Sequence, residues 1–357
     1  MFEYTSKRCR KCMLQNDESR GLIIDDEGLC PLCRSFKPVE RDWEALERAF
    51  EGQIDTLRTG DKYEAVLMMS GGKDSAYLAY LLKKKMGLKI LGLTIDNGFE
   101  YPETFEKATA LAKDLDIPHV MFRTDPVDTI RFYRFLVAES NLMDKDFGQI
   151  CLYCGRYLLD VSTDFANKMG IPAVFVGYNP EQLFGMGKTH EIETDPLRQS
   201  QQQAIAARIA YLYDKMEVEA EKLDTRDFVP RFSLEPEGCK IFYPFLYLPY
   251  RPQEIMETAR QETSWEPIAS FASDHYIASG CKLLKLMAAL AKINNVSSYM
   301  DYEFSAQVRA GDLDKEALEK YYSALEESPE FYTEVLNHLG LDCSLETLAN
   351  SPSKKVG

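Results

Sequence analysis

A glycine-rich turn between a strand-like run and a helical run limits the fold of this chain more than any other feature. Residues 66–82 read VLMMSGGKDSAYLAYLL, so an apolar run ends at Met69 and a helical pattern follows the turn at 70–75 directly. Two glycines let backbone N–H groups approach an anion, the helix N-terminus adds partial positive charge, and Lys73 adds a full one. The segment therefore predicts a phosphate-binding loop. Its spacing is neither that of the Walker loop nor the GxGxxG of dinucleotide-binding proteins.

Strand-like and helix-like segments alternate around this turn. The runs EAVLMM, KILGLTI, HVMFR and PAVFVG are short and apolar, and longer helical patterns separate them. This alternation predicts an α/β fold in which βαβ units build a parallel sheet covered on both faces. The run IFYPFLYLP at 241–249 fits either a last strand or an ordered apolar loop, and from about residue 253 the patterns are helical only.

These patterns divide the chain into five segments. We expect a zinc-ribbon-like four-cysteine module at 1–40, a linker helix at 41–60, a phosphate-loop domain at 61–252, a helical region at 253–349 and a flexible tail at 350–357. The apolar face of the C-terminal helices is either core or a homodimer surface.

The first four cysteines form two CxxC pairs, Cys9 with Cys12 and Cys30 with Cys33. Two such pairs, seventeen residues apart, are typical of a structural site in which four thiolates bind zinc. The segment has little apolar periodicity of its own, so the metal would supply folding energy. A redox or cluster role stays open as the alternative.

A second cysteine group surrounds the last part of the predicted sheet. Cys151 and Cys154 stand just before a helical segment, and Cys239 stands just before the run at 241–249. We expect the N-terminus of that helix to lower the pKa of the Cys154 thiol and to favour thiolate. For Cys151 and Cys154 the alternatives are a second zinc half-site or a redox pair without a cluster. For Cys239 the alternative is an ordinary buried thiol.

Charge and hydropathy restrict partners and compartment. The chain has 42 Lys and Arg against 57 Asp and Glu, a net charge of −15. An acidic protein repels a phosphate backbone, so a small-molecule substrate is favoured over nucleic acid, which is not excluded. The sequence lacks an apolar run long enough for a bilayer and an apolar region near its start, and we therefore predict a cytoplasmic protein that does not contact membranes.

The turn SGGKDS after a strand resembles the signature of the PP-loop ATP pyrophosphatases, also called the adenine nucleotide α-hydrolase-like superfamily. The resemblance implies that the turn binds the β- and γ-phosphates of ATP with Mg²⁺, while a substrate oxygen attacks the α-phosphate and pyrophosphate leaves. Lys73 and Asp74 are the implied catalytic residues of the turn. The nucleotide-binding residues that the resemblance implies are Ser70, Gly71, Gly72, Lys73, Asp74, Ser75, Asp96, Gly177 and Asn179. For Asp96 a plain turn is the alternative.

Two narrower resemblances point to different nucleophiles that would attack the adenylate. The segment from Cys9 to Phe36, with the following Asp42 and Trp43, resembles the N-terminus of the N-acetyl sugar amidotransferases, which implies ammonia from a glutaminase partner. The placement of Cys151 and Cys154 is similar to the CxxC of PP-loop tRNA thiolases of the TtcA and TtuA type. In those families the pair and a third cysteine hold a [4Fe–4S] cluster, which implies Cys239 as the third ligand here.

These observations rank three functions. The first is an ATP-dependent, AMP-forming sulfurtransferase that replaces an oxygen of a small molecule by sulfur from a donor, with Cys151, Cys154 and Cys239 as catalytic residues that carry a cluster or a persulfide. The second is an N-acetyl sugar amidotransferase that uses ammonia from a glutaminase partner. A tRNA thiolase is the alternative to the small-molecule substrate of the first. A nucleotide-binding module without catalysis is the third, and it leaves the intact turn and the cysteine pair without a purpose.

Overall fold

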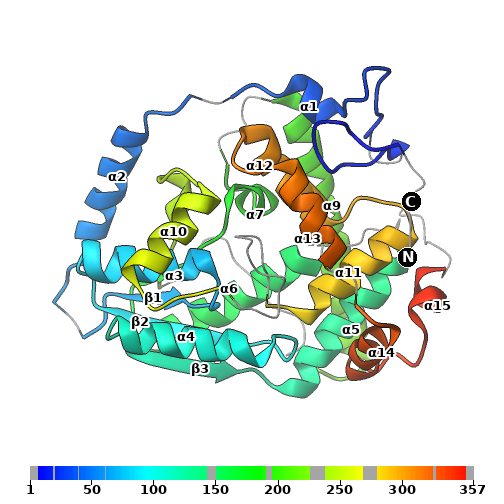
Figure 1. Ribbon diagram of the computed structural model, residues 1–357. Helices are drawn as coiled ribbons and strands as arrows, with labels where there is room; N and C mark the ends of the chain where they lie inside the picture. The colour runs from blue at the N-terminus through cyan, green and yellow to red at the C-terminus, as the bar shows by residue number, and fades with distance from the viewer. Residues whose placement is uncertain are drawn as a thin grey trace.

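The computed structural model describes residues 7–18, 21–38, 40–60, 62–142, 150–189, 195–225, 238–267, 280–324 and 327–350 (Figure 1). At its centre lies a five-stranded sheet in the order β3-β2-β1-β4-β5, and each neighbouring pair is parallel. Its strands are β1 (Ala65–Met68), β2 (Ile90–Asp96), β3 (His119–Arg123), β4 (Ala173–Phe175) and β5 (Lys240–Phe242). The predicted α/β class with a parallel sheet is confirmed.

The run at 241–249 is strand only in its first residues. β5 ends at Phe242, and a 3-10 turn, η3 (Pro244–Leu246), follows. Pro244 has no N–H to give to a neighbouring strand, which accounts for the end of β5 at this point.

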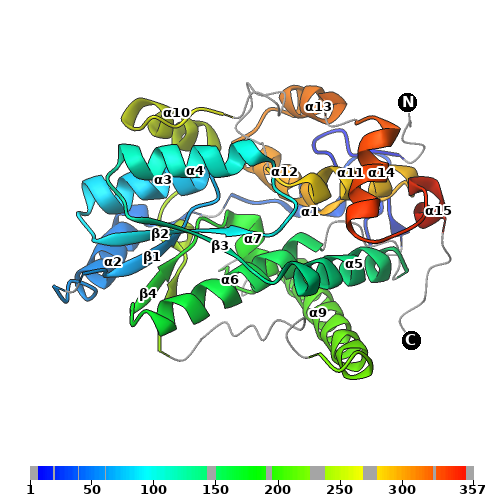
Figure 2. The same ribbon diagram turned by 90° about the horizontal axis from the view of Figure 1, so that it is seen from below.

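Helices cover both faces of the sheet (Figure 2). The helices α3 (Lys73–Tyr80) and α4 (Pro102–Asp114) lie on one face, with α2 (Trp43–Asp55) and α10 (Pro252–Glu262) in the same core. The helix α6 (Ile150–Lys168) lies on the other face. Alternate strand residues divide between the two cores, because side chains of a strand point to opposite faces: Leu67 packs in the first core and Val66 in the second. A short π-helical segment, η2 (Leu81–Lys85), extends α3.

Further helices form a third core, which lies beyond the carboxyl ends of the strands. Its helices are α5 (Pro126–Leu142), the first turns of α6, α9 (Pro196–Lys222), α11 (Lys282–Ile293), α14 (Pro329–His338) and α15 (Leu345–Ala349). The far end of α9 projects from the body of the protein (Figure 2). The remaining C-terminal helices, α12 (Tyr299–Ala310) and α13 (Lys315–Ala324), form a smaller core around Phe304 and Leu318.

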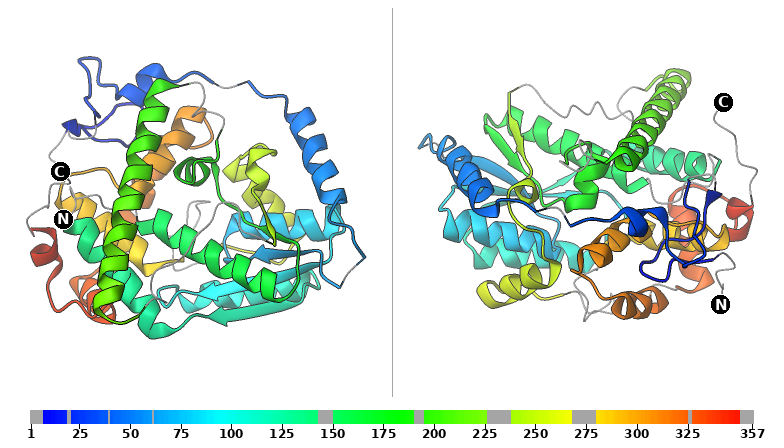
Figure 3. Two further views of the ribbon diagram at one scale, coloured as in Figure 1. Left: turned by 180° about the vertical axis from the view of Figure 1, so that it is seen from behind. Right: turned by 90° about the horizontal axis from the view of Figure 1, so that it is seen from above.

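Among its described residues, the N-terminal module has one short α-helix, α1 (Pro31–Ser35). The module lies against the C-terminal helices, not against the sheet (Figure 3). Met13 of the module is part of the core formed by α12 and α13. In the described ranges, the structure has no helix with the length and apolar character needed to cross a membrane.

Candidate active site and metal centre

A cavity of about 340 Å³ opens at the carboxyl ends of β1, β2 and β4. The chain runs from β1 outward to β3 and then returns to place β4 on the other side of β1, so the cavity lies where the strand order reverses. Ligands of open parallel sheets bind at this position. All six residues of the turn at 70–75 line the cavity, as does Gly177 of the turn after β4.

Contacts from distant segments fix the conformation of the glycine-rich turn. Gly71 has a φ of +74°, and a Cβ at this position would come within 2.4 Å of the Thr104 carbonyl oxygen, so no other residue fits. The indole Nε1 of Trp265 donates to the Gly71 carbonyl at 2.8 Å. Gly72, the residue that caps α3, lines the cavity, and its amide donates to Ser70 Oγ at 3.4 Å within the turn. The turn therefore presents the N-terminus of α3 and its helix dipole to an anion.

Lys73 and Asp74 lie side by side at the start of α3. The Lys73 ammonium donates to Asp74 Oδ2 at 2.8 Å and to the Tyr250 hydroxyl at 3.0 Å. The other carboxylate oxygen of Asp74 is buried and has no hydrogen-bond partner in the part of the chain that the structure describes. A buried carboxylate oxygen without a partner is a fitting ligand for a hard cation such as Mg²⁺.

The turn after β4 packs directly against the glycine-rich turn. A Cβ on Gly177 would lie 3.3 Å from the Cβ of Asp74, so glycine allows the close approach. Asn179 caps α7 (Pro180–Gly185): its Oδ1 accepts from the amides of Glu181 and Gln182. Its Nδ2 donates to Glu303 of α12. Asn179 also lines the cavity, and its predicted contact with the nucleotide stays a prediction.

At the end of β2, the residues that line the cavity are not the one predicted to contact the nucleoside. The carboxylate of Asp96 accepts from Arg123 Nε at 2.6 Å and from the Gly98 amide at 2.8 Å, and it does not line the cavity. The neighbouring Asn97 and Glu100 do line it. A contact of Asp96 with the nucleoside stays a prediction.

Two half-buried carboxyl groups, Glu100 and Glu303, line the cavity. Burial raises the pKa of Glu303 to about 7, although the nearby Lys73 acts to lower it. Burial also raises the pKa of Glu100 to about 7, and Asn97 donates to its Oε1 at 3.1 Å. Electrostatic interactions link Glu303 to Lys73 and Asp74 of the turn, and both carboxyl groups also act on the thiol of Cys151. Neither residue stands in a motif that the sequence could have revealed.

The second end of the cavity is lined by thiols. Cys151 and Cys154 lie on the first two turns of α6, which begins at Ile150, so the pair is inside the helix and not before it. Tyr133 and Cys154 are hydrogen-bonded, with 3.0 Å between Oη and Sγ. Cys281, the residue that caps α11, lines the same wall and its backbone pairs with Glu100. Cys281 is not part of the cysteine group predicted from sequence, because its position in the sequence carries no spacing signal.

The thiol pKa values differ from the expectation. Burial raises the pKa of Cys154 to about 12 and also raises the pKa values of Cys151 and Cys281. The expected lowering by the helix N-terminus is wrong, because loss of hydration disfavours the thiolate more than the helix dipole favours it.

Cys239 lies away from these thiols. It is buried in the core between the sheet and α6, where its thiol contacts the Thr163 carbonyl oxygen at 3.8 Å, and it does not line the cavity. The structure therefore brings Cys151 and Cys154 together with Cys281 and leaves Cys239, the third ligand that we predicted, on the other side of α6.

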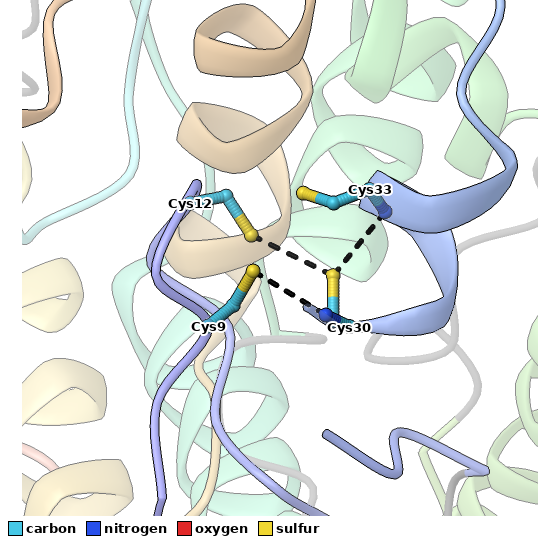
Figure 4. Close-up of side chains that lie close together, drawn as sticks. All are labelled: Cys9, Cys12, Cys30 and Cys33. Carbon is cyan, nitrogen blue, oxygen red and sulfur yellow. Dashed lines mark hydrogen bonds between the residues drawn. The ribbon is translucent and has the colours of Figure 1, made fainter. Parts of the chain in front are cut away.

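The four N-terminal cysteines form a compact and closed centre (Figure 4). All four are buried and their sulfur atoms lie within 4.8 Å of one another. Backbone amides of Cys30 and Cys33 donate to the sulfurs of Cys9 and Cys30, both at 3.4 Å. Hydrogen bonds with Cys30 and Cys33 lower the pKa of Cys12 to about 7. Four sulfurs at this spacing fit one tetrahedral metal ion. Among the described residues, this is the one group with ligand atoms so close together.

Comparison with known proteins identifies the domain around the cavity. Residues 64–187 match the family model described as queuosine biosynthesis protein QueC. The tRNA 2-thiolation protein NcsA of Haloferax volcanii is 30% identical over 122 residues, which are 32% of this chain and 36% of that protein. The cytoplasmic tRNA 2-thiolation protein 1 of Kluyveromyces lactis is 25% identical over 189 residues, 47% of this chain and 49% of that protein.

The chain spans less than two thirds of the length of the curated relatives that it matches. A solved structure, the U34-tRNA thiolase NcsA from Methanococcus maripaludis with its [4Fe-4S] cluster, is 14% identical with a TM-score of 0.37, and the match covers 98% of this chain and 99% of that one. Its likeness at this level adds nothing to the assignment, which rests on the matched domain and on the turn at 70–75. The domain at residues 64–187 is that of the adenine nucleotide α-hydrolase-like, or PP-loop, superfamily.

Proposed function

We propose that the protein is an AMP-forming sulfurtransferase that activates a carbonyl oxygen of a tRNA base with ATP and replaces it by sulfur. The observation that carries this proposal is a single cavity with the phosphate-binding turn at one end and three cysteines at the other. A purely nucleotide-binding module would need the first end only.

The chemistry proceeds in two balanced steps. The base oxygen attacks the α-phosphorus of ATP, pyrophosphate leaves, and the oxygen becomes part of an adenylate. Hydrosulfide then attacks the carbon, and AMP departs with the former base oxygen. The backbone amides of the turn and Lys73 would stabilise charge on the phosphates, and the free oxygen of Asp74 would bind the Mg²⁺ that accompanies ATP.

The cysteines supply the sulfur end of this reaction. Cys151, Cys154 and Cys281 are the residues that would hold a [4Fe–4S] cluster, and three thiols leave one iron open to bind the sulfide to be transferred. Their chemistry fits the cluster: the three thiols line one cavity, and a four-iron cluster separates its ligand sulfurs more widely than a single metal ion does. Zinc is the metal that best fits the closed N-terminal centre.

The substrate class differs from the small molecule that composition favoured. Two curated relatives are named as tRNA 2-thiolation proteins, and this supports tRNA over a small molecule. The charge of −15 opposes RNA binding, so we expect contacts with few phosphates and a shallow dependence of the affinity on salt.

We also retain three proposals from the sequence. One is the division of the chain into five segments that end at residues 40, 60, 252, 349 and 357. The tail beyond residue 350 lies outside the described residues. Another is a cytoplasmic location, which suits reduced thiols and the name of the Kluyveromyces relative. The third is a homodimer.

The test is an anaerobic assay of AMP release with Mg-ATP, sulfide and an unmodified tRNA transcript. Reconstituted protein should release AMP and form thionucleoside in equal amounts, measured by chromatography and by mass spectrometry of the digested RNA. Lys73→Ala should abolish both, whereas Cys281→Ser should abolish the thionucleoside.

Two outcomes would contradict this proposal. AMP release that requires ammonia and an N-acetyl sugar, and ignores sulfide, would establish the amidotransferase that the N-terminal cysteine segment resembles. Sulfide-dependent AMP release with no need for tRNA would return the substrate to a small molecule.

A further inference from the structure

The wall of the cavity opposite the sheet comes from α12, which is also the helix that holds the N-terminal module. Met300, Glu303, Phe304 and Gln307 of α12 line the cavity. The opposite side of the helix contacts the module: the Met13 amide donates to Ser305 Oγ at 3.1 Å. One helix thus touches both the four-cysteine centre and the nucleotide end of the cavity.

Several independent contacts fasten the module to this part of the chain. The amide of Gln15 donates to Ser297 Oγ at 2.9 Å, just before α12. The Lys315 ammonium, at the start of α13, donates to the carbonyl oxygens of Cys9 and Arg10, both at 3.1 Å. Met13 packs among apolar side chains of α12 and α13, and Tyr302 packs against the cysteine centre itself. Cys9 is both a metal ligand candidate and an acceptor for Lys315, so the centre and the helices share one backbone segment.

The cavity side of α12 is connected to the phosphate-binding turn by three short steps. Glu303 accepts a hydrogen bond from Asn179 Nδ2. Asn179 uses its Oδ1 to cap α7, and this fixes the turn that contains Gly177. Gly177 packs against the Cβ of Asp74, at the start of α3. Displacement of α12 would therefore release the cap of α7 and the packing of the two nucleotide turns.

We propose that the metal-bound four-cysteine module sets the geometry of the nucleotide cavity by holding α12, and that Glu303 is the positioning residue that passes this on to Asn179. The inference rests on the proposed use of ATP. It assigns the module a role in nucleotide binding in addition to its own folding. Glu303 acts through a hydrogen bond to Asn179, and its charge is not required.

The first test compares the affinity for Mg-ATP of Glu303→Ala and Glu303→Gln by isothermal titration calorimetry. Glutamine keeps an acceptor for Asn179 and should stay within about threefold of the original protein, whereas alanine should weaken binding by about tenfold or more. Glu334, an exposed residue of α14, is the matched control, and its two substitutions should change nothing. If glutamine weakens binding as much as alanine, the hydrogen bond is not the cause and the inference is wrong.

The second test perturbs the module and reads the cavity without ATP. Removal of the metal, followed by restoration of Mg²⁺, should raise amide hydrogen exchange in α12 and in residues 177–183 while exchange in β1 and β2 stays slow. Ser305→Ala, which leaves all four cysteines in place, should raise exchange in the same segments to a smaller extent. Thr333→Ala on α14 is its control.

The two tests combine into a cycle that separates positioning from general loss of stability. With Glu303→Ala in place, metal removal should cost little further ATP affinity, because the link is already broken. The inference is overturned if metal removal weakens ATP binding by the same factor with and without Glu303→Ala. It is also overturned if hydrogen exchange in α7 does not change after metal removal. Metal-loaded protein that binds no ATP at all would instead overturn the proposed function, and the exchange measurement would still decide whether the module holds α12.

Discussion

The N-terminal centre and the thiol end of the cavity both use a CxxC spacing, yet their sulfurs are arranged in opposite ways. At the N-terminus four buried sulfurs lie within 4.8 Å of one another, and backbone amides point at two of them. In the cavity, Cys151, Cys154 and Cys281 share a wall but not a metal-sized space, and the Tyr133 hydroxyl is next to Cys154. The first arrangement is closed and suits structure, whereas the second is open on one side and suits chemistry.

The contrast also appears in the pKa values. Hydrogen bonds among the N-terminal thiols lower the pKa values of Cys9 and Cys12 and raise those of Cys30 and Cys33, while burial raises the pKa of Cys154 to about 12. Two of the N-terminal thiols therefore lose their protons readily to a metal ion, whereas the cavity thiols stay protonated until a cation or cluster displaces the proton. The same four-residue spacing gives different chemistry because the surroundings differ.

The largest effect should come from the closed centre. Cys30→Ser removes one of four ligands, so the protein should lose its zinc, and the free energy of unfolding should fall by a substantial part of the roughly 10 kcal/mol that structural zinc can provide. Metal analysis and thermal unfolding measure this. A variant that keeps one zinc per chain and its original Tm would mean that the centre is not a four-thiolate site.

Substitution of a cysteine that lines the cavity should lower the activity and leave the stability unchanged. Cys281→Ser should reduce thionucleoside formation at least about 100-fold, equivalent to roughly 3 kcal/mol, with zinc content and Tm unchanged. The reason is that Cys281 lines the cavity and caps only the start of α11. Full sulfur transfer by this variant would remove Cys281 from the site and leave the pair to act alone.

Between the two regions lies Glu303, whose titration should be visible in stability. Its pKa is raised by burial to about 7 in the folded protein, against 4.5 for an exposed carboxyl, so the folded state binds the proton more tightly. Its favourable contribution is present below pH 4.5 and is lost as the pH rises through 7. Urea unfolding should show Glu303→Gln more stable than the original protein at pH 8, by on the order of 3 kcal/mol, with little difference at pH 4.5. An equal difference at both pH values would mean that the carboxyl does not titrate in this range.

The smallest effect should belong to Cys239. Cys239→Ala removes a buried thiol from the core between the sheet and α6, so the free energy of unfolding should fall by about 1 kcal/mol and sulfur transfer should not change. Chemical denaturation and the thionucleoside assay check the two parts. Loss of transfer in this variant would restore Cys239 as the third ligand and break the contrast drawn above.

The sheet and the phosphate-binding turn could be predicted from sequence because both are local patterns. β2 and β3 match the expected runs almost residue for residue, and the segment at 70–75 leads from β1 into the first turn of α3 as expected. The helical pattern expected after this turn ends in the π-helical segment η2, which no periodicity signals.

The far wall of the cavity could not be predicted because tertiary packing alone places it there. Trp265, Cys281 and Glu303 come from a region whose sequence shows only apolar helical periodicity, and they reach residues 71, 100 and 179 across about 120 to 200 positions. The pKa of Cys154 was misjudged for the same reason: proximity to a helix N-terminus is local, whereas burial is decided by helices elsewhere in the chain.

The docking of the N-terminal module on α12 has a consequence for the order of events during synthesis. Met13 and Ser305 are 292 positions apart, so the ribosome completes the module long before it makes the helix that receives it. At 5–20 residues per second the delay is about 15–60 s. During this time the four cysteines are exposed on a nascent chain, where capture of zinc would protect them from oxidation until translation delivers their partner.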